Sequence, residues 1–256
     1  MSKQGALGSA FYVGGYDLSG DVSSVGKISS PRDVLDFTAV NDTGYERQYG
    51  LRGGEIDITS FFRGSGDWGP GGGTMTGLVG SAGIALLPTA DEVATFFIGQ
   101  ALQAPAVSVN GKQLNYDPTR DDTGNLTLAV TVQANAYGLE WGEQLTAGLR
   151  TDTTATTGAA ITDAAGTTYG GQAYFHLTAF TGTSVTIDIQ SCTTSGGTYA
   201  TTGLTTTAMT AIGAQRLAVS NTTTINRYLK VVTTGTFTNA KFAVNFARNL
   251  TAGVTF

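Results

Sequence analysis

Short runs that alternate apolar and polar residues, separated by turn-forming residues, are the feature that most constrains how this chain can fold. In the run from Leu126 to Ala136, Leu and Val occupy every second position up to Val132, and Thr, Ala and Gln occupy the alternate positions up to Gln133. This is the period of a half-buried β-strand. Gly supplies 36 of the 256 residues, roughly double the usual ~7%, and charged residues make up 13%, about half of the usual ~25%. Pattern and composition together predict a mainly β protein with many short strands and tight turns.

The stretch from Asp33 to Phe62 organises the first half of the chain. We expect one strand over Asp33–Thr38 and a second over Glu55–Thr59, joined as a long-looped β-hairpin. The insert Thr43–Tyr49 is long enough for one or two helical turns, and Gly50–Gly54 can take the positive φ of a tight return. The hairpin would therefore carry a polar loop.

The order of residues in this stretch resembles the opening of the major tail tube proteins of long-tailed, non-contractile bacteriophages. In that family a strand ends in a D-x-T-like sequence, an insert follows, and a G-L-x-D-G-like turn leads to a second strand. The matching residues are Asp36, Thr38, Gly50, Leu51, Gly53 and Gly54, followed by Ile56 and Ile58. Gly53 stands where the pattern often has an acidic residue. The resemblance covers about residues 10 to 148 and implies a tail-tube-like β-sandwich or barrel with one α-helix.

The same resemblance implies a structural virion protein that is assembled in the host cytoplasm and located in the phage tail, beside other tail proteins. Six copies would form a ring, stacked rings would form a tube, and double-stranded DNA would pass through the lumen without specific binding. The net charge of -5 and the pI near 4.7 suit such a wall and argue against binding through DNA phosphates. Contacts between subunits are expected at Tyr45, Arg47, Tyr49, Leu51, Arg52 and Trp68.

Four further segments are expected in the first half, which we take as a domain over residues 1–149. Residues 1–32 are rich in Gly and Ser and are expected to form a flexible arm that can order on a neighbour. Apolar residues at helical spacing predict a helix over Thr74–Leu87, which Pro88 ends. Strands are expected over Glu92–Ile98 and Ala104–Tyr116, the latter interrupted by a turn at Asn110-Gly111.

One cofactor motif occurs by letter but lacks its structural context. Gly64, Gly66 and Gly69 spell G-x-G-x-x-G after a predicted strand, the fingerprint of dinucleotide binding. Pro70 and three further glycines follow, so no helix can open inside the motif as a βαβ unit requires. We therefore expect a flexible loop over Gly64–Gly73 and no cofactor.

The second half, residues 150–256, is expected to be a linker followed by an all-β sandwich. Residues 150–170 are almost all Thr, Ala, Gly and Asp, which is typical of a linker or long loops. Alternating strands are then expected over Gln172–Phe180, Ser184–Gln190, Gln215–Val219, Arg227–Thr233 and Lys241–Ala247. This half resembles the immunoglobulin-like or galactose-binding-like domains appended to phage virion proteins, which implies a domain that decorates the outside of the tube.

No catalytic or metal-binding pattern emerges from the sequence. His176 is the single histidine and is expected at an exposed strand position beside Tyr174, and Cys192 is expected to be an ordinary free thiol. No calcium or phosphate loop is present, and no stretch has the apolar length of a signal peptide or a membrane span. We expect a protein that is not an enzyme, binds no metal or cofactor and does not insert into a membrane.

A second functional interpretation remains open. A minor tail or virion-surface protein could use the C-terminal sandwich to hold host-surface carbohydrate. Its candidate contacts are the tyrosines near loops, Tyr169, Tyr199 and Tyr228. A tube subunit should form rings or polymers at high concentration, whereas an adhesin should form a small closed oligomer that binds glycans.

Overall fold

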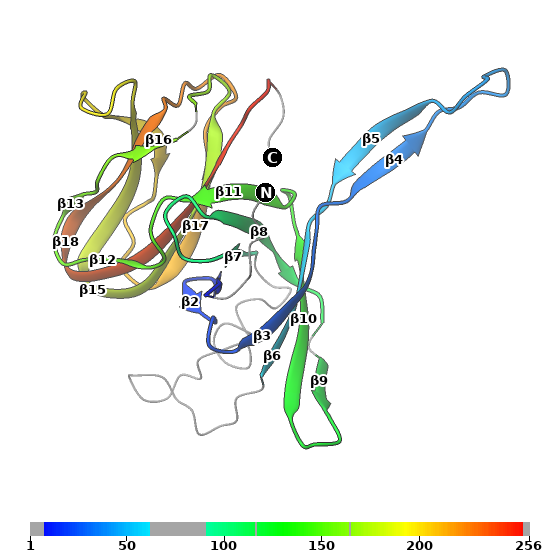
Figure 1. The fold of residues 1–256 in the computed structure, drawn as a ribbon, viewed down its shortest axis with the longest axis horizontal. Coiled ribbons are helices and arrows are strands. Elements are labelled where there is room, and N and C mark those ends of the chain that lie inside the picture. Colours follow the sequence, from blue (N-terminus) through cyan, green and yellow to red (C-terminus); the bar gives the residue numbers. More distant parts are fainter. Residues whose placement is uncertain (1–7, 62–90, 116, 164, 253–256) are drawn as a thin grey trace.

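The computed structural model describes residues 8–61, 91–115, 117–163 and 165–252. Within these ranges the chain forms strands and turns and no helix, which confirms the predicted mainly β fold. One 16-stranded sheet and a separate two-stranded ribbon account for the strands (Figure 1). The helix predicted over Thr74–Leu87, the Gly64–Gly73 loop and Trp68 lie outside the described residues.

The first half of the chain wraps its part of the sheet around one apolar core. The sheet runs from β3 through β6, β10 and β8 to β7, β1 and β2. The strands of this half are β1 (Ala10–Val13), β2 (Tyr16–Asp17), β3 (Val22–Ser29), β4 (Arg32–Asp36), β5 (Arg47–Arg52), β6 (Glu55–Phe61), β7 (Glu92–Phe97), β8 (Pro105–Gln113), β9 (Asp117–Arg120), β10 (Leu126–Ala134) and β11 (Glu140–Gln144).

Alternation along β6 and β10 builds that core as predicted. Ile56 lies opposite Val132 and Ile58 opposite Val130, and all four side chains are buried. Cross-strand apolar pairs of this kind fix the register, because a shift by one residue would turn each strand's apolar face to solvent. Phe11 and Val13 of β1 pack into the same core. Residues 10–29 thus contribute ordered strands, in contrast to the flexible arm expected there.

The two strands of the predicted hairpin each pair with other strands in the structure. β4 pairs with β5, whereas β6 pairs with β3 and β10, so the two strands expected to pair with each other do not. The prediction of helical turns over Thr43–Tyr49 was wrong, since β5 begins at Arg47, and the prediction of a turn at Gly50 fails for the same reason. The physical cause is apolar matching. Ile56 and Ile58 find Ile28 and Val25 on β3, where both sets of side chains are withdrawn from solvent.

The turn predicted at Asn110-Gly111 is also absent, because β8 continues straight through both residues. Gly111 is needed there for close packing. A Cβ at this position would lie 2.1 Å from the carbonyl oxygen of Gln133 on the neighbouring strand. β9 and β10 form a hairpin whose loop begins at Asp121.

Two very long antiparallel strands, β15 and β18, form the frame of the second half. The strands of this half are β12 (Arg150–Asp152), β13 (Thr156–Thr157), β14 (Ile161–Thr162), β15 (Gly171–Cys192), β16 (Ala200–Thr205), β17 (Gly213–Ala218) and β18 (Tyr228–Arg248). Each long strand merges two strands that the sequence predicts as separate. The two interruptions lie opposite each other, with Gly182 beside Phe237 and Val185 beside Gly235, so they pair as irregular strand and form no loops.

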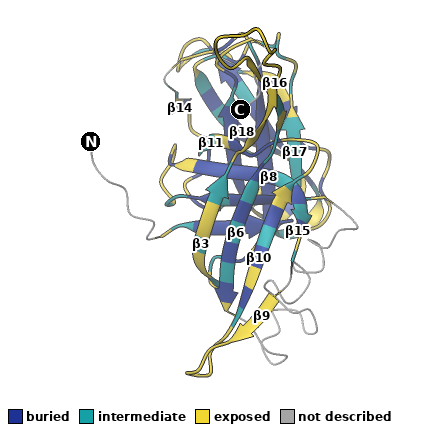
Figure 2. Cartoon of the chain, turned by 90° about the vertical axis from the view of Figure 1, so that its right-hand side faces the viewer, coloured by how far each residue is buried: buried dark blue, intermediate teal, exposed yellow. Residues whose placement is uncertain are grey.

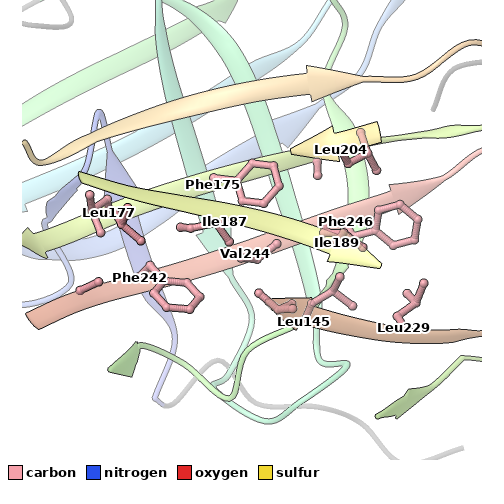
Figure 3. Close-up of a cluster of buried hydrophobic side chains, with 14 of the residues drawn as sticks. Leu145, Phe175, Leu177, Ile187, Ile189, Leu204, Leu229, Phe242, Val244 and Phe246 are labelled. Carbon is pink, nitrogen blue, oxygen red and sulfur yellow. The ribbon is translucent and has the colours of Figure 1, made fainter. Parts of the chain in front are cut away.

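The side chains of β15 and β18 that face inward match the prediction. Figure 3 shows Phe175, Leu177, Ile187 and Ile189 of β15 meeting Phe242, Val244 and Phe246 of β18 in one buried cluster. The segment expected as a linker, residues 150–170, supplies β12, β13 and β14, which add to the edge of β18. It therefore forms part of the sheet.

β11 joins the two halves, because it pairs with β8 on one side and with β18 on the other. Polar side chains predicted to face solvent are consequently covered. His176 and Asn245 are both 0% exposed. The Nε2 of His176 lies 2.8 Å from the Thr95 hydroxyl, and the Asn245 amide donates to the Ser108 hydroxyl at 2.7 Å. The exposed position predicted for His176 was wrong. Its polar neighbours suggested a solvent-facing strand face, but β7 and β8 pack over that face. The predicted domain boundary after residue 149 stays a prediction.

Candidate functional site

The ribbon formed by β4 and β5 is the most prominent surface feature of the described chain. It projects away from the body of the molecule as a long two-stranded arm (Figure 1). The large apolar side chains that it exposes to between 48% and 109% are Val34, Leu35, Phe37, Val40, Tyr45, Tyr49 and Leu51. A concentration of exposed large apolar side chains on one projecting element is typical of an interaction site.

The tip of the ribbon is held by the D-x-T residues of the sequence pattern. The Thr38 hydroxyl and amide both donate to the Asp36 carboxylate, at 2.5 and 3.0 Å. The Glu46 amide in turn donates to the Thr38 hydroxyl at 2.9 Å, which closes the ribbon across both strands. Donation from Thr38 holds the pKa of Asp36 below its usual range. These two residues therefore shape the loop, which explains their spacing in the sequence.

The structure brings most of the predicted contact residues together on this ribbon. The guanidinium of Arg47 lies 4.1 Å from the centre of the Tyr45 ring, and Tyr49 and Leu51 stand exposed further down the same strand. Arg52 is different, since it turns into the body of the protein and lies 4.0 Å from the Glu140 carboxylate. Four of the six predicted residues are thus accessible on the ribbon, Arg52 lies at its base, and Trp68 is outside the described residues.

Sequence reasoning missed the apolar residues of β4 as contact candidates. Val34, Leu35 and Phe37 belong to the predicted strand over Asp33–Thr38, and the prediction did not consider them as contacts. The adjacent pair Val34-Leu35 was an available signal, because consecutive apolar residues in a strand point to opposite faces and a half-buried strand covers one face alone.

A second surface is the open face of β3, β6, β10 and β9, which lie side by side in Figure 2. Its side chains are polar and partly exposed. The ammonium of Lys27 lies 2.8 Å from the Glu55 carboxylate, and the Thr131 hydroxyl donates to Asp57 at 2.7 Å. This polar face has paired charges and no cluster of unpaired basic side chains among the described residues.

A buried ionic cluster connects the ribbon's base to the second half. The Arg216 guanidinium donates to Glu140 at 2.8 and 3.2 Å, and the Tyr174 hydroxyl donates to the same carboxylate. The Arg216 guanidinium also stacks over the Tyr137 ring at 3.6 Å. Burial and the neighbouring Glu140 charge raise the pKa of Tyr174 well above its usual value, so this hydroxyl stays protonated and acts as a donor.

The three tyrosines considered for carbohydrate binding have different surroundings. Tyr169 lines a surface hollow of about 440 Å³ together with Asn226 and Arg227. Arg227 also lies 5.6 Å from the Tyr228 ring, and the Tyr199 ring lies under the Lys230 ammonium at 4.1 Å. Burial and the nearby Cys192 and Tyr228 side chains raise the pKa of Tyr199, so Tyr199 and Tyr228 are neighbours. The hollow beside Tyr169 is thus the part of that prediction that has a matching surface.

Residues with potential for catalysis do not assemble into a reactive site in the described chain. Burial lowers the pKa of His176 to about 3, so its imidazole is neutral, and it contacts Thr95 and the Tyr12 ring. Cys192 is a free, buried thiol. Among the described residues no three His, Cys, Asp or Glu side chains gather as a metal site would need. No helix in the described ranges is long and apolar enough to span a membrane.

No protein family matches the chain, and no curated protein matches it either. Among solved structures, the chain is similar to the Dit (gp 19.1) protein of phage SPP1, described as a paradigm of the hub adsorption apparatus of phages that infect Gram-positive hosts. That match has 10% identity and a TM-score of 0.36, and it covers 94% of this chain and 99% of that one. A match to infectious bursal disease virus, Gx strain, has 13% identity, a TM-score of 0.20 and coverage of 96% and 69%. At these scores neither likeness carries an argument about fold family or function.

Proposed function

We propose that this chain is a structural protein of a phage tail, and specifically a tail tube subunit that assembles into stacked hexameric rings. The observation that carries the proposal is the projecting ribbon of β4 and β5, whose large apolar side chains are between 48% and 109% exposed in the described chain. An arm of this kind gains its stability from a neighbouring subunit. The D-x-T and G-L-x-G-G residues that resemble tail tube proteins lie on or beside this ribbon.

The open face of β3, β6, β10 and β9 is the surface proposed to line the lumen. Lys27 on this face is paired with Glu55, and the chain as a whole carries a net charge of -5. Such a wall offers no phosphate-binding surface, so double-stranded DNA would slide past it without specific binding. The second half of the chain would then project outward as a decoration, and the protein would act without catalysis or cofactors in the virion tail.

The test is the assembly state of the full-length chain. Sedimentation velocity and negative-stain electron microscopy over a range of concentrations should reveal rings or tubes. Replacement of both Tyr49 and Leu51 by Glu should leave a folded monomer, whereas the matched exposed changes Thr222→Glu and Ser195→Glu, placed far from the ribbon, should not affect assembly. A wild-type chain that forms only small closed oligomers would contradict the tube proposal.

The hollow beside Tyr169 supports the alternative of a virion-surface protein that holds carbohydrate. A Tyr ring beside Asn and Arg donors is a surface on which a sugar ring can stack and form hydrogen bonds. Glycan-array binding by the wild-type chain that is lost in Tyr169→Ala, together with the absence of tubes, would favour this alternative.

A further inference from the structure

Arg52 is a predicted contact residue that the ribbon does not present to solvent. Its side chain is 18% exposed, whereas Tyr49 and Leu51 of the same strand are largely exposed. The guanidinium points back across the base of the ribbon, where it lies 4.0 Å from the Glu140 carboxylate of β11. Within the described residues this is the one ion pair that joins the ribbon to the body of the molecule.

The ribbon joins the body through two short links that lie outside any strand. Residues 30–31 connect β3 to β4, and residues 53–54 connect β5 to β6 (Figure 1). The Gly53 amide donates to the Pro31 carbonyl at 2.8 Å, which ties the two links to each other. Gly54 is packed on the body, because a Cβ there would lie 2.5 Å from the Leu139 backbone nitrogen. Two adjacent links at the base of an element form a hinge about which the element can turn as a unit.

The side chain of Arg52 crosses this hinge to a fixed anchor. It lies over Gly138, where an added Cβ would stand 2.9 Å from the Arg52 Nε. Beyond Gly138, the Glu140 side chain is 1% exposed and its carboxylate is held by the Arg216 guanidinium at 2.8 Å. Arg216 belongs to β17, so the anchor includes a strand of the second half of the chain. Charges withdrawn from water are screened less by salt than surface charges, so this pair can restrain the ribbon across the hinge.

A restrained ribbon is suited to meet a partner at one angle. An arm that turns freely is in the binding-competent direction for only part of the time, and its apparent affinity falls by that fraction. We infer that Arg52 is a positioning residue, which holds the ribbon at a fixed angle to the body through Glu140 and thereby lowers the concentration at which copies assemble. The effect on assembly rests on the proposed function, whereas the fixed angle is a property of the single molecule.

Distances within the monomer test the fixed angle. Cys192 is replaced by Ala in every chain, and spin labels are attached at Gly44→Cys in the ribbon loop and Ser195→Cys in the second half, two exposed positions. Double electron–electron resonance should give a narrow distance distribution for this pair when Arg52 is present and a broader one in Arg52→Met. A reference pair at Ser24→Cys and Ser195→Cys, with both labels on the body, should keep its distribution.

Two further variants separate the position of the guanidinium from loss of charge. Gly138→Ala keeps both charges but places a methyl group against the Arg52 side chain, so it should broaden the ribbon distances as Arg52→Met does. The two changes combined should broaden them little further. Lys112→Met removes the pair of Lys112 with Asp91 at 3.4 Å, which does not involve the ribbon, and serves as the matched control with unchanged distances.

Sedimentation velocity of the full-length, unlabelled chains tests the effect on assembly. Arg52→Met and Gly138→Ala should each require a concentration about threefold to tenfold above that of the wild type, because a smaller fraction of ribbons has the competent direction. Lys112→Met should assemble as the wild type does.

Four results would count against parts of this account. A ribbon distribution in Arg52→Met as narrow as that of the wild type would refute the positioning role and leave the proposed assembly function intact. Equal broadening of the reference pair would also refute it, since Arg52 would then support the whole fold. Broader ribbon distances with unchanged assembly would refute the effect of the angle on assembly. A wild-type chain that never assembles would refute the proposed function, while broadening in monomeric Arg52→Met would still support the fixed angle.

Discussion

At the scale of single residues, the buried Glu140 carboxylate depends on nearby positive charges for its stability. It is 1% exposed, and its charge is balanced by Arg216 at 2.8 Å, with Arg52 further away at 4.0 Å. We expect Arg216→Met to lower the free energy of unfolding by about 3 kcal/mol, because it leaves a buried carboxylate with an insufficient counter-charge. Urea unfolding followed by circular dichroism measures this loss.

The double variant Glu140→Gln with Arg216→Met separates charge burial from lost packing. It removes both charges and should be less destabilised than the sum of the single changes. Lys241→Met, which removes an exposed cation, serves as the control and should change stability by less than about 0.5 kcal/mol. Additive losses in the cycle would show that the pair is not coupled.

Glu143 gives the fold a pH dependence whose sign can be derived. Burial, reinforced by the nearby Asp163 charge, raises the pKa of Glu143 to about 7. In the unfolded chain this carboxyl titrates near 4.3. Between these values the folded chain keeps a proton that the unfolded chain has released, so stability falls as pH rises through this window. The loss from this group should stay below about 4 kcal/mol, the value of the full pKa difference before solvent screening, and it should vanish below about pH 4.

Replacement of Glu143 by Gln should remove that dependence. The difference in unfolding free energy between wild type and Glu143→Gln should grow from about pH 5 to about pH 7.5, with the variant the more stable at the upper end. Parallel urea titrations of both chains at several pH values provide the measurement. Parallel stability curves for the two chains would contradict the assignment.

At the scale of elements, close packing of β8 against β10 depends on Gly111. A Cβ at this position would lie 2.1 Å from the Gln133 carbonyl oxygen. Because that oxygen belongs to the backbone, the clash can be relieved only by distorting the pairing of β8 with β10. We expect Gly111→Ala to destabilise the fold by about 1 to 3 kcal/mol. Gly44→Ala, at an exposed position with no atom within 4 Å of the added methyl, should be neutral. Equal unfolding midpoints for both variants in urea would contradict this account.

Gly111 also shows where sequence reasoning about elements succeeds and fails. The alternation that defines β10 and the inward face of β15 could be predicted, because it depends on local period alone. The dipeptide Asn110-Gly111 predicts a turn when only local sequence is considered. In the structure it lies inside β8, where the close approach of β10 leaves room only for a glycine. The pairing partners of the strands could not be predicted either. β6 pairs with β3 and not with β4, and this choice depends on apolar matching between segments that are distant in sequence.

The ribbon of β4 and β5 should be the least protected element of the free protein. Its residues are mostly exposed, and within the described residues β4 and β5 pair only with each other, whereas β15 and β18 pair over most of their length around a buried core. We expect its amides to exchange with deuterium far faster than those of β15 in the monomer. Assembly should slow ribbon exchange and leave β15 unchanged. Hydrogen-exchange mass spectrometry of monomeric and assembled samples measures both, and an unprotected ribbon in the assembly would exclude it as the contact.

At the scale of the whole molecule, the candidate site was foreseen in part. The sequence pattern directed attention to Tyr45, Arg47 and Tyr49, and these lie on the projecting ribbon. It could not show that Leu35 and Phe37 are exposed, because exposure depends on whether another strand covers them. Nor could it show that His176 is buried, since a polar strand face looks the same in sequence whether it meets solvent or another sheet.

The buried junction between the halves predicts how the molecule unfolds. β11 contributes hydrogen bonds to β8 and β18 at once, and the contacts of His176 with Thr95 and of Glu140 with Arg216 cross the same junction. Unfolding of either half would expose buried polar groups of the other, at a cost of about 1 to 3 kcal/mol for each group left without a partner. We therefore expect a single cooperative transition for the full chain. Calorimetry should give equal calorimetric and van't Hoff enthalpies, whereas two resolved transitions would show that the halves are independent domains that merely share a strand edge.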